Sequence, residues 1–306
     1  MNELVVHNII KYIGNENKQL YKFDKSQQYE LQNIIDRWII AFMNFPDDFN
    51  IINEKMRQEL IDKHIVSSTN SHEFMNMLIK KLKQEYDEQV HTSYMLDSKL
   101  THMLSLINPN VAKKLAQYNK EDVYQMLIRY NVQSNQWMVP TVVVDYLHRI
   151  FNVTIEAFAS PINHRLDTYL SLYTKDKIFG SSGNFFKVDP SFFVGKSSLV
   201  NPPFVELVMV KMLNRLTAVF ESQTHKNTRF FVVLPNWTDA VFYKLITTSK
   251  YKVYQTVLQR GNYFYETPAG KTVVATFNTL FVVLANFTDE IKEKYNDIIT
   301  VWTSRR

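Results

Sequence analysis

The sequence predicts an α/β fold in which an all-helical domain, residues 1–135, precedes a mixed α/β domain, residues 136–306. In the first part, apolar residues recur at the spacing of helix faces, and Gly14 is the only glycine. From Thr141 onward, short apolar runs typical of strands alternate with helical patterns, as in sheets covered by helices. Prolines follow three of these runs and mark strand ends, because proline cannot donate to a sheet ladder.

Six helices are expected in the first domain. In the first of them, Leu31, Ile34, Ile35 and Trp38 share one face, and Pro46 follows its end. The expected helices cover residues 28–45, 51–64, 71–86, 95–107, 111–118 and 120–130.

The second domain is expected to form one sheet with an antiparallel member. Its expected helices cover residues 141–151, 205–220 and 238–247, and its expected strands cover residues 153–160, 197–200, 229–234, 252–259, 272–277 and 280–285. In open α/β sheets, ligands bind at the carboxyl ends of the strands. We therefore expect Ser160-Pro161, Asn201-Pro202 and Pro235-Asn236 to border one crevice.

Composition excludes several kinds of site. The 306 residues are 45% apolar and 21% charged, which is typical of a globular protein. No cysteine is present, so disulfides, thiolate metal sites and cysteine nucleophiles are excluded. The eight histidines show no metal-ligand spacing, and we expect no metal. The chain has no apolar run of about 18 residues and no signal-peptide pattern. We expect no membrane span and an intracellular protein, nuclear, cytoplasmic or virus-encoded.

Charge is distributed unevenly along the chain. Residues 1–150 hold 17 Lys and Arg against 18 Asp and Glu, a net charge of −1, whereas residues 151–306 hold 18 against 12, a net charge of +6. A basic half is expected of a domain that receives a polyanion, although a solvated basic surface without a ligand gives the same count.

The stretch Asn201-Pro202-Pro203-Phe204 carries the clearest chemistry in the sequence. An Asn-Pro-Pro-aromatic tetrapeptide after a strand is the signature of enzymes that methylate exocyclic amino groups of adenine or cytosine. The Asn201 side-chain oxygen and the Pro202 carbonyl would accept the two amino hydrogens, and stiff prolines would hold both acceptors in place. Phe204 would stack on the base. The alternative is a turn that merely ends the strand.

Two segments are candidates for binding S-adenosylmethionine. The usual Gly-x-Gly fingerprint is missing, and Ala159-Ser160-Pro161 follows the first strand instead. Phe179-Gly180-Ser181 lies in the part of the chain richest in small residues, and it either wraps the cofactor or forms a flexible surface loop. Asp176 and Asp189 are candidates for the ribose hydroxyls, with turn formation as the alternative.

Several motifs in fixed order resemble one family, over roughly residues 136–300. They are Leu147-His148-Arg149, Phe158-Ala159-Ser160-Pro161-Ile162-Asn163, Phe179-Gly180-Ser181, Asn201 to Phe204 followed by Glu206, Leu234-Pro235-Asn236-Trp237 and Asn278-Thr279. Together they resemble the cap-specific adenosine N6-methyltransferases related to the phosphorylated-CTD-interacting factor.

The resemblance implies a Rossmann-like methyltransferase domain after the helical domain, with S-adenosylmethionine as donor and capped RNA as partner. The acceptor would be N6 of the adenosine next to the N7-methylguanosine cap. The residues expected to act in catalysis are Asn201, Pro202, Pro203 and Phe204. Those expected to bind the cofactor are Ala159, Ser160, Pro161, Asp176, Phe179, Gly180, Ser181 and Asn201. Those expected to bind the substrate are Phe204, Glu206, Asn236, Trp237, Asn163 and Arg165. The chain resembles a short member without the family's WW domain, so binding to the polymerase tail is not expected.

Other functions remain open from the sequence. An N6-adenine methyltransferase acting on DNA or uncapped RNA would need the same tetrapeptide, and a non-catalytic RNA-binding homologue would keep the fold. Cap selectivity needs a second aromatic pocket, because methylated guanine is a flat cation. Trp38 and Trp137 are candidates for that pocket, with core packing as the alternative for both.

Overall fold

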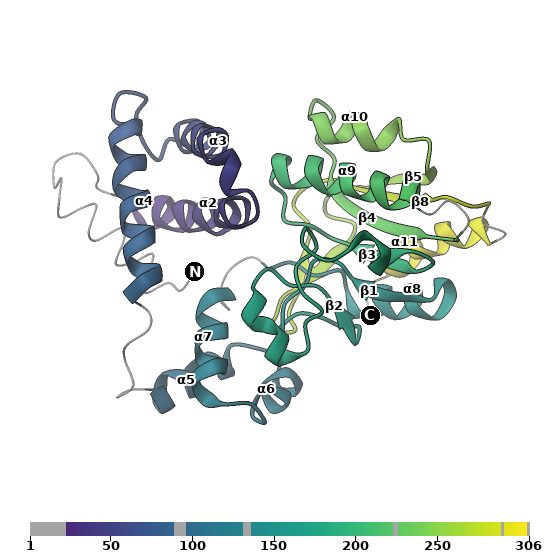
Figure 1. Cartoon of the computed structure of the whole chain (residues 1–306), viewed down its shortest axis with the longest axis horizontal. Coiled ribbons are helices and arrows are strands. Elements are labelled where there is room, and N and C mark those ends of the chain that lie inside the picture. The colour runs from purple at the N-terminus through teal and green to yellow at the C-terminus, as the bar shows by residue number, and fades with distance from the viewer. Residues whose placement is uncertain (1–22, 89–95, 131–135, 223–225, 289–290, 305–306) are drawn as a thin grey trace. The chain divides into compact units, whose positions relative to one another are not determined.

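A computed structural model of the chain describes residues 23–88, 96–130, 136–222, 226–288 and 291–304. The chain divides into two compact units, residues 1–135 and 136–306 (Figure 1). Each unit is described by itself below. No helix in the described part is both long and apolar enough to cross a membrane.

The described part of the first unit is helical, with a short 3-10 turn, η1, at Pro46–Asp48. Its helices are α2 (Lys25–Asn44), α3 (Phe49–Asp62), α4 (Ser71–Glu88), α5 (Leu96–Ser105), α6 (Pro109–Leu115) and α7 (Lys120–Tyr130). Helix α2 begins three residues before the predicted start, because Asp24 and Gln27 form a capping box. The predicted apolar face is buried, with Leu31 and Ile34 fully inaccessible.

The second unit contains a six-stranded sheet in the order β2-β1-β3-β4-β8-β5. The strands are β1 (Val153–Glu156), β2 (Thr168–Tyr169), β3 (Ser197–Val200), β4 (Arg229–Pro235), β5 (Lys252–Leu258) and β8 (Thr279–Ala285). Strands β2, β1, β3 and β4 are parallel, and β8 is antiparallel to both of its neighbours. The α/β prediction with an antiparallel member is confirmed.

Helices cover both faces of the sheet (Figure 1). One face packs on α8 (Thr141–Phe151) and α11 (Tyr295–Thr303), and the other on α9 (Glu206–Ser222) and α10 (Val241–Thr247). Side chains of β4 alternate between the two cores, with Phe231 in the first and Phe230 in the second. Both β4 and β8 are buried at every position, as expected of strands covered on two sides.

Two expectations about this unit need correction, and one helix was not predicted. Residues 272–277 do not join the main sheet, since β7 (Thr272–Val274) forms a separate hairpin with β6 (Phe264–Glu266). Strand β1 ends at Glu156 rather than at residue 160, because the chain bends after it: Ala157 donates to Leu199 of β3, whereas Ala159 donates to Leu170 beside β2. Helix α11 was not predicted, although Trp302 is fully buried there.

The connections place a topological switch point between β1 and β3. From β1 the chain runs to β2 on one side, and it then returns to β3 on the other side. Ligands of open α/β sheets bind beside such a point, at the carboxyl ends of the strands. The residues that follow β1 and β3 at this edge are those of the two predicted motifs.

Candidate active site

Asn201 follows β3 directly, and its carboxamide is anchored on one side only. Its Nδ2 donates to the Trp137 carbonyl at 3.2 Å. Within the described residues, the structure gives no partner for Asn201 Oδ1 or for the Pro202 carbonyl. Pro202 is buried, and the next carbonyl, of Pro203, accepts from the Val205 N–H at 2.8 Å. Two oxygen acceptors therefore remain available at the end of β3.

A group of aromatic rings lies next to these acceptors. The half-buried Phe204 ring meets Phe277 edge-on, with ring centroids 5.6 Å apart. Phe277 stacks on Trp137 at 5.4 Å and an interplanar angle of 11°. Tyr265 contacts Trp137 at 5.5 Å. Because Trp137 also holds Asn201, this group, the aromatic wall, belongs to the same site as the acceptors.

The turn after β1 contributes a buried hydroxyl. Ser160 is 2% exposed, and its Oγ has no hydrogen-bond partner. The turn is fixed by Asn163, whose Oδ1 accepts from the Ser160 N–H at 2.7 Å, and Pro161 is buried. Buried polar groups are nearly always paired, so an unpaired hydroxyl at this edge suits a polar ligand.

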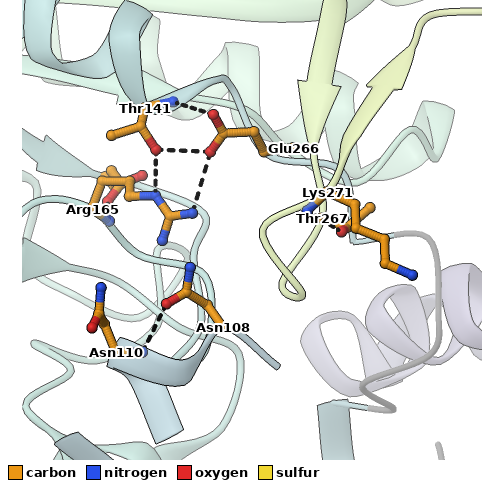
Figure 2. A network of polar contacts seen from close by, with 8 residues as sticks. Asn108, Asn110, Thr141, Arg165, Glu266, Thr267 and Lys271 are labelled. Carbon is orange, nitrogen blue, oxygen red and sulfur yellow. Dashed lines mark hydrogen bonds and ion pairs between the residues drawn. The ribbon is translucent and has the colours of Figure 1, made fainter. Parts of the chain in front are cut away.

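Arg165 and Glu156 are committed to internal contacts. The buried Glu156 carboxylate, at the end of β1, accepts from the backbone N–H groups of Arg165 and Leu166. Burial raises the pKa of Glu156, and the two hydrogen bonds and the Arg165 charge oppose that shift. The Arg165 guanidinium donates to Thr141 Oγ1 at 2.9 Å and to Glu266 Oε2 at 3.3 Å (Figure 2). These contacts leave Arg165 a structural role that the sequence did not indicate.

The 179–184 loop is fixed along β2 by several hydrogen bonds. Ser182 donates to the Tyr169 carbonyl at 2.9 Å, and the Ser171 hydroxyl donates to Ser181 Oγ at 2.7 Å. Gly180 has φ +93°, where other residues are strained. Phe179 and Ser181 are buried. These contacts favour a loop that is held in place over the flexible-loop alternative.

The two aspartates considered for the ribose differ in their surroundings. Asp176 is fully buried in η2 (Thr174–Phe179), and its carbonyl accepts from the Ser181 N–H at 3.2 Å. Asp189 caps η3 (Pro190–Phe193) by accepting from the Ser191 N–H at 2.9 Å. Hydrogen bonds from Ser191 lower the pKa of Asp189. Asp189 is therefore the turn former that the sequence left as an alternative.

The end of β4 adds a second unpaired oxygen and an exposed ring. Asn236 Oδ1 is buried without a partner, and the Asn236 N–H donates to the Asn278 carbonyl at 2.9 Å. Trp237 is 42% exposed, and its ring rests edge-on against Phe242. Since Asn278 follows Phe277 of the aromatic wall, this strand end is joined to the Asn201 site through backbone contacts.

Glu206 links two helices on the same side of the sheet. It lies in the first turn of α9, and its Oε1 accepts from the backbone N–H of Val241, the first residue of α10. The carboxylate satisfies one of the N–H groups that a helix start leaves unpaired. This contact gives Glu206 a structural role beside the expected substrate contact.

The two tryptophans proposed for a cap pocket lie in different environments. Trp38 is 7% exposed, and its indole N–H donates to Glu59 at 2.6 Å, so it is part of the core of the first unit. Trp137 is half-buried and belongs to the aromatic wall. Within its own unit, Trp137 therefore lies beside the predicted catalytic residues.

Sequence reasoning missed Phe277, Tyr265 and Glu266, which surround Trp137. Phe277 was placed in a strand of the main sheet, although it immediately precedes the Asn278-Thr279 motif. Tyr265 and Glu266 lie in a three-residue strand, too short for an alternating pattern to be recognised. No group of three or more metal-binding side chains occurs in the described part of the chain.

Comparison with known proteins agrees with the motifs. Residues 99–267, more than half of the chain, match the family model described as "Phosphorylated CTD interacting factor 1 WW domain". Over 148 residues the chain is 32% identical to a mouse protein, and 31% identical to a human protein, each named "mRNA (2'-O-methyladenosine-N(6)-)-methyltransferase". These alignments cover 46% of this chain and 20% of each relative. The chain belongs to the phosphorylated CTD interacting factor 1 family.

Proposed function

We propose that the protein is an RNA methyltransferase that transfers a methyl group from S-adenosylmethionine to N6 of adenosine, next to an N7-methylguanosine cap. One observation carries the proposal: Asn201 Oδ1 and the Pro202 carbonyl are two available acceptors beside an aromatic wall. The amino group of adenine has two hydrogens and a π-face beside it, so the arrangement is complementary to that base. The names of the relatives support the choice of acceptor.

The sheet supports a Rossmann-like methyltransferase domain over residues 136–306. Its parallel strands, its single antiparallel strand among those described and its switch point between β1 and β3 are compatible with that fold. The acceptors lie at the carboxyl end of β3, and the unpaired Ser160 hydroxyl follows the adjacent β1.

The residues at this edge fit S-adenosylmethionine as a polar ligand. The buried and unpaired Ser160 Oγ is the observation that favours a ligand there. Residues proposed to hold it are Ala159, Ser160, Pro161, Asp176, Phe179, Gly180, Ser181 and Asn201. When bound, the cofactor supplies an electrophilic methyl group.

Residues of the chain orient and polarise the adenine amino group that receives the methyl group. Asn201 Oδ1 and the Pro202 carbonyl accept the two N6 hydrogens, which favours a pyramidal nitrogen with its lone pair free for attack. Phe204 stacks on the adenine and holds the base in the plane set by the acceptors. Fixed acceptors need no reorganisation during the reaction, so positioning and electrostatics supply most of the catalysis. Once the new N–C bond has formed, the positively charged nitrogen releases one of its protons to solvent.

Trp237 and Asn236 are proposed substrate contacts on the same edge. An exposed tryptophan that is supported by a second ring offers a stacking surface for a nucleotide. Asn236 Oδ1 offers a buried acceptor beside it. Of the other proposed substrate residues, Asn163, Arg165 and Glu206 act mainly through internal contacts.

Methyl transfer to matched RNAs tests which adenosine accepts the methyl group. Two RNAs of one sequence beginning with adenosine, one with an N7-methylguanosine cap and one without, are incubated with labelled S-adenosylmethionine. The proposal predicts a much higher rate on the capped RNA and competition by free cap analogue. Equal rates without competition would move the acceptor to internal adenosines or to DNA.

A further inference from the structure

The Asn201 carboxamide has two different ends, and the contacts around it distinguish them. Its Nδ2 lies 3.2 Å from the Trp137 carbonyl, and an oxygen in that position would face another oxygen. The carboxamide therefore has one stable orientation, with Oδ1 directed away from Trp137. A carboxylate has no hydrogen to offer and would place an acceptor against an acceptor.

The Trp137 carbonyl is itself held rigidly. Met138, the next residue, pairs with Glu266 through two backbone hydrogen bonds of 2.8 and 3.0 Å. The Trp137 ring contacts both Phe277 and Tyr265. Rotation of the peptide that carries the carbonyl would break the hydrogen bond that the Met138 N–H donates to Glu266.

Side-chain contacts of Glu266 also hold the 137–141 segment in place. Glu266 accepts from the Thr141 N–H at 3.2 Å and from its hydroxyl at 2.7 Å, at the start of α8 (Figure 2). The same carboxylate pairs with Arg165, and both side chains are less than one-fifth exposed. Glu266 thus ties the 137–141 segment to the β6–β7 hairpin and to the turn after β1.

We infer that the Trp137 carbonyl is a positioning group that presents Asn201 Oδ1 to the acceptor nitrogen, and that it selects an amide rather than a carboxylate at position 201. The part of this inference that concerns the acceptor nitrogen rests on the proposed function. Glu266 and Arg165 are positioning residues for this carbonyl, because they act through the 137–141 segment and not on the substrate.

Asn201→Asp tests the inference, because a protonated carboxyl group can replace the amide whereas a carboxylate cannot. The protonated form donates to Trp137 and keeps one oxygen free for the acceptor. The facing carbonyl raises the pKa of the introduced carboxyl above its usual value of about 3.9. Methyl transfer by the variant should therefore fall about tenfold per pH unit above that pKa, a limb absent from the wild-type profile.

Stability supplies a readout that does not need activity. A carboxyl with a raised pKa in the folded state stays protonated there while the unfolded chain ionises. The variant's deficit in Tm against wild type should thus be small below about pH 4 and grow until the raised pKa is passed. Other groups near the segment, Glu156, Arg165 and Glu266, are present in both proteins, so their titration cancels in the difference.

Asn286→Asp is a matched control at the other end of the sheet. Asn286 Nδ2 also donates to a backbone carbonyl, that of Lys226 at 2.9 Å, while its Oδ1 accepts from the Thr228 N–H at 2.8 Å. This variant should lose Tm against wild type while it keeps the wild-type pH profile of activity.

The outcomes distinguish a failure of the positioning role from a failure of the proposed function. Recovery of methyl transfer by Asn201→Asp at low pH, with a Tm deficit that grows with pH, supports the inference. A pH-independent Tm deficit, a wild-type pH profile, or inactivity at every pH where the variant is folded would overturn it. If wild type itself transfers no methyl group, the proposed function fails, whereas the Tm comparison still decides whether the Trp137 carbonyl faces position 201.

Discussion

At the scale of single residues, the site depends on which polar atoms are already paired. Asn201 uses Nδ2 for the protein and keeps Oδ1 available, whereas Ser160 keeps its only side-chain polar atom unpaired in a buried position. Ser171 is the contrasting case, since its equally buried hydroxyl is bonded to Ser181 at 2.7 Å. This difference between the two serines is the reason for proposing Ser160, and not Ser171, as a ligand contact.

Ser160→Ala should leave the ligand-free protein as stable as wild type, or more stable, because a buried unpaired hydroxyl costs about 1–3 kcal/mol. The same change should weaken binding of S-adenosylmethionine. Ser171→Ala, in contrast, should lower Tm because it removes the buried hydrogen bond from the Ser171 hydroxyl to Ser181 Oγ. Thermal unfolding and calorimetric titration of both variants check this, and a Ser160→Ala protein with full cofactor affinity would remove Ser160 from the proposed site.

Phe204→Ala should reduce acceptor affinity and leave cofactor affinity nearly unchanged. Base–aromatic stacking is worth about 1–3 kcal/mol by such substitutions, a factor of roughly 5 to 150 in affinity. Phe192→Ala, which removes a half-buried ring from η3, is the control for general loss of packing. Loss of cofactor binding with normal RNA binding would mean that Phe204 faces the cofactor.

At the scale of elements, the sequence predicted helices and several strands well, but it did not indicate two very short strands. The predicted helix at 141–151 and strand at 197–200 have the bounds that the structure gives to α8 and β3. Strand β2 has two residues and β6 has three, so neither carries a readable pattern.

The residues of the site could likewise be predicted only where a local sequence pattern contains them. The role of residues 201–204 could be predicted from the sequence, because this one tetrapeptide contains both hydrogen-bond acceptors and an aromatic ring. The Trp137 carbonyl was not visible, because a backbone oxygen 64 positions away in the sequence has no signal of its own. The structural role of Arg165 was not predicted, because its tertiary contacts with Thr141 and Glu266 cannot be read from sequence spacing.

The tie between α9 and α10 gives a prediction for Glu206. Glu206→Ala removes the acceptor for the first N–H of α10 and should destabilise the protein by about 0.5–2 kcal/mol, as loss of a helix cap does. Glu206→Gln keeps an oxygen acceptor and should retain most of that stability. Equal loss of methyl transfer in both variants, with unfolding curves like wild type, would instead assign Glu206 to the substrate.

At the scale of the whole molecule, charge and aromatic content agree with an RNA substrate. The half of the sequence that holds the site carries a net charge of +6, calculated as 18 basic minus 12 acidic residues. The exposed Trp237 adds a stacking surface to that charge. The chain aligns with only 20% of the length of its mouse and human relatives, so their further partners are not transferred to it.

RNA affinity should therefore fall steeply as salt rises. Each neutralised phosphate of a single strand contributes about −0.7 to the slope of log affinity against log salt, and we expect a slope of about −2 or steeper, equal to about three phosphates. Fluorescence anisotropy with capped RNA at several salt concentrations measures it. A slope near zero would exclude the basic half as the RNA-binding surface.

In the proposed reaction, Asn201 and Pro202 activate an adenosine amino group. The most direct test is methyl transfer to capped RNA by wild type and Asn201→Ala, with the product nucleoside identified by mass spectrometry and folding checked by thermal unfolding. Wild type should form N6-methyladenosine, and the folded variant should lose about 100- to 1,000-fold in turnover, the effect of removing one preorganised polar group. Near-normal turnover by a normally folded Asn201→Ala protein, or a methyl group on another atom, would rule out this role of Asn201.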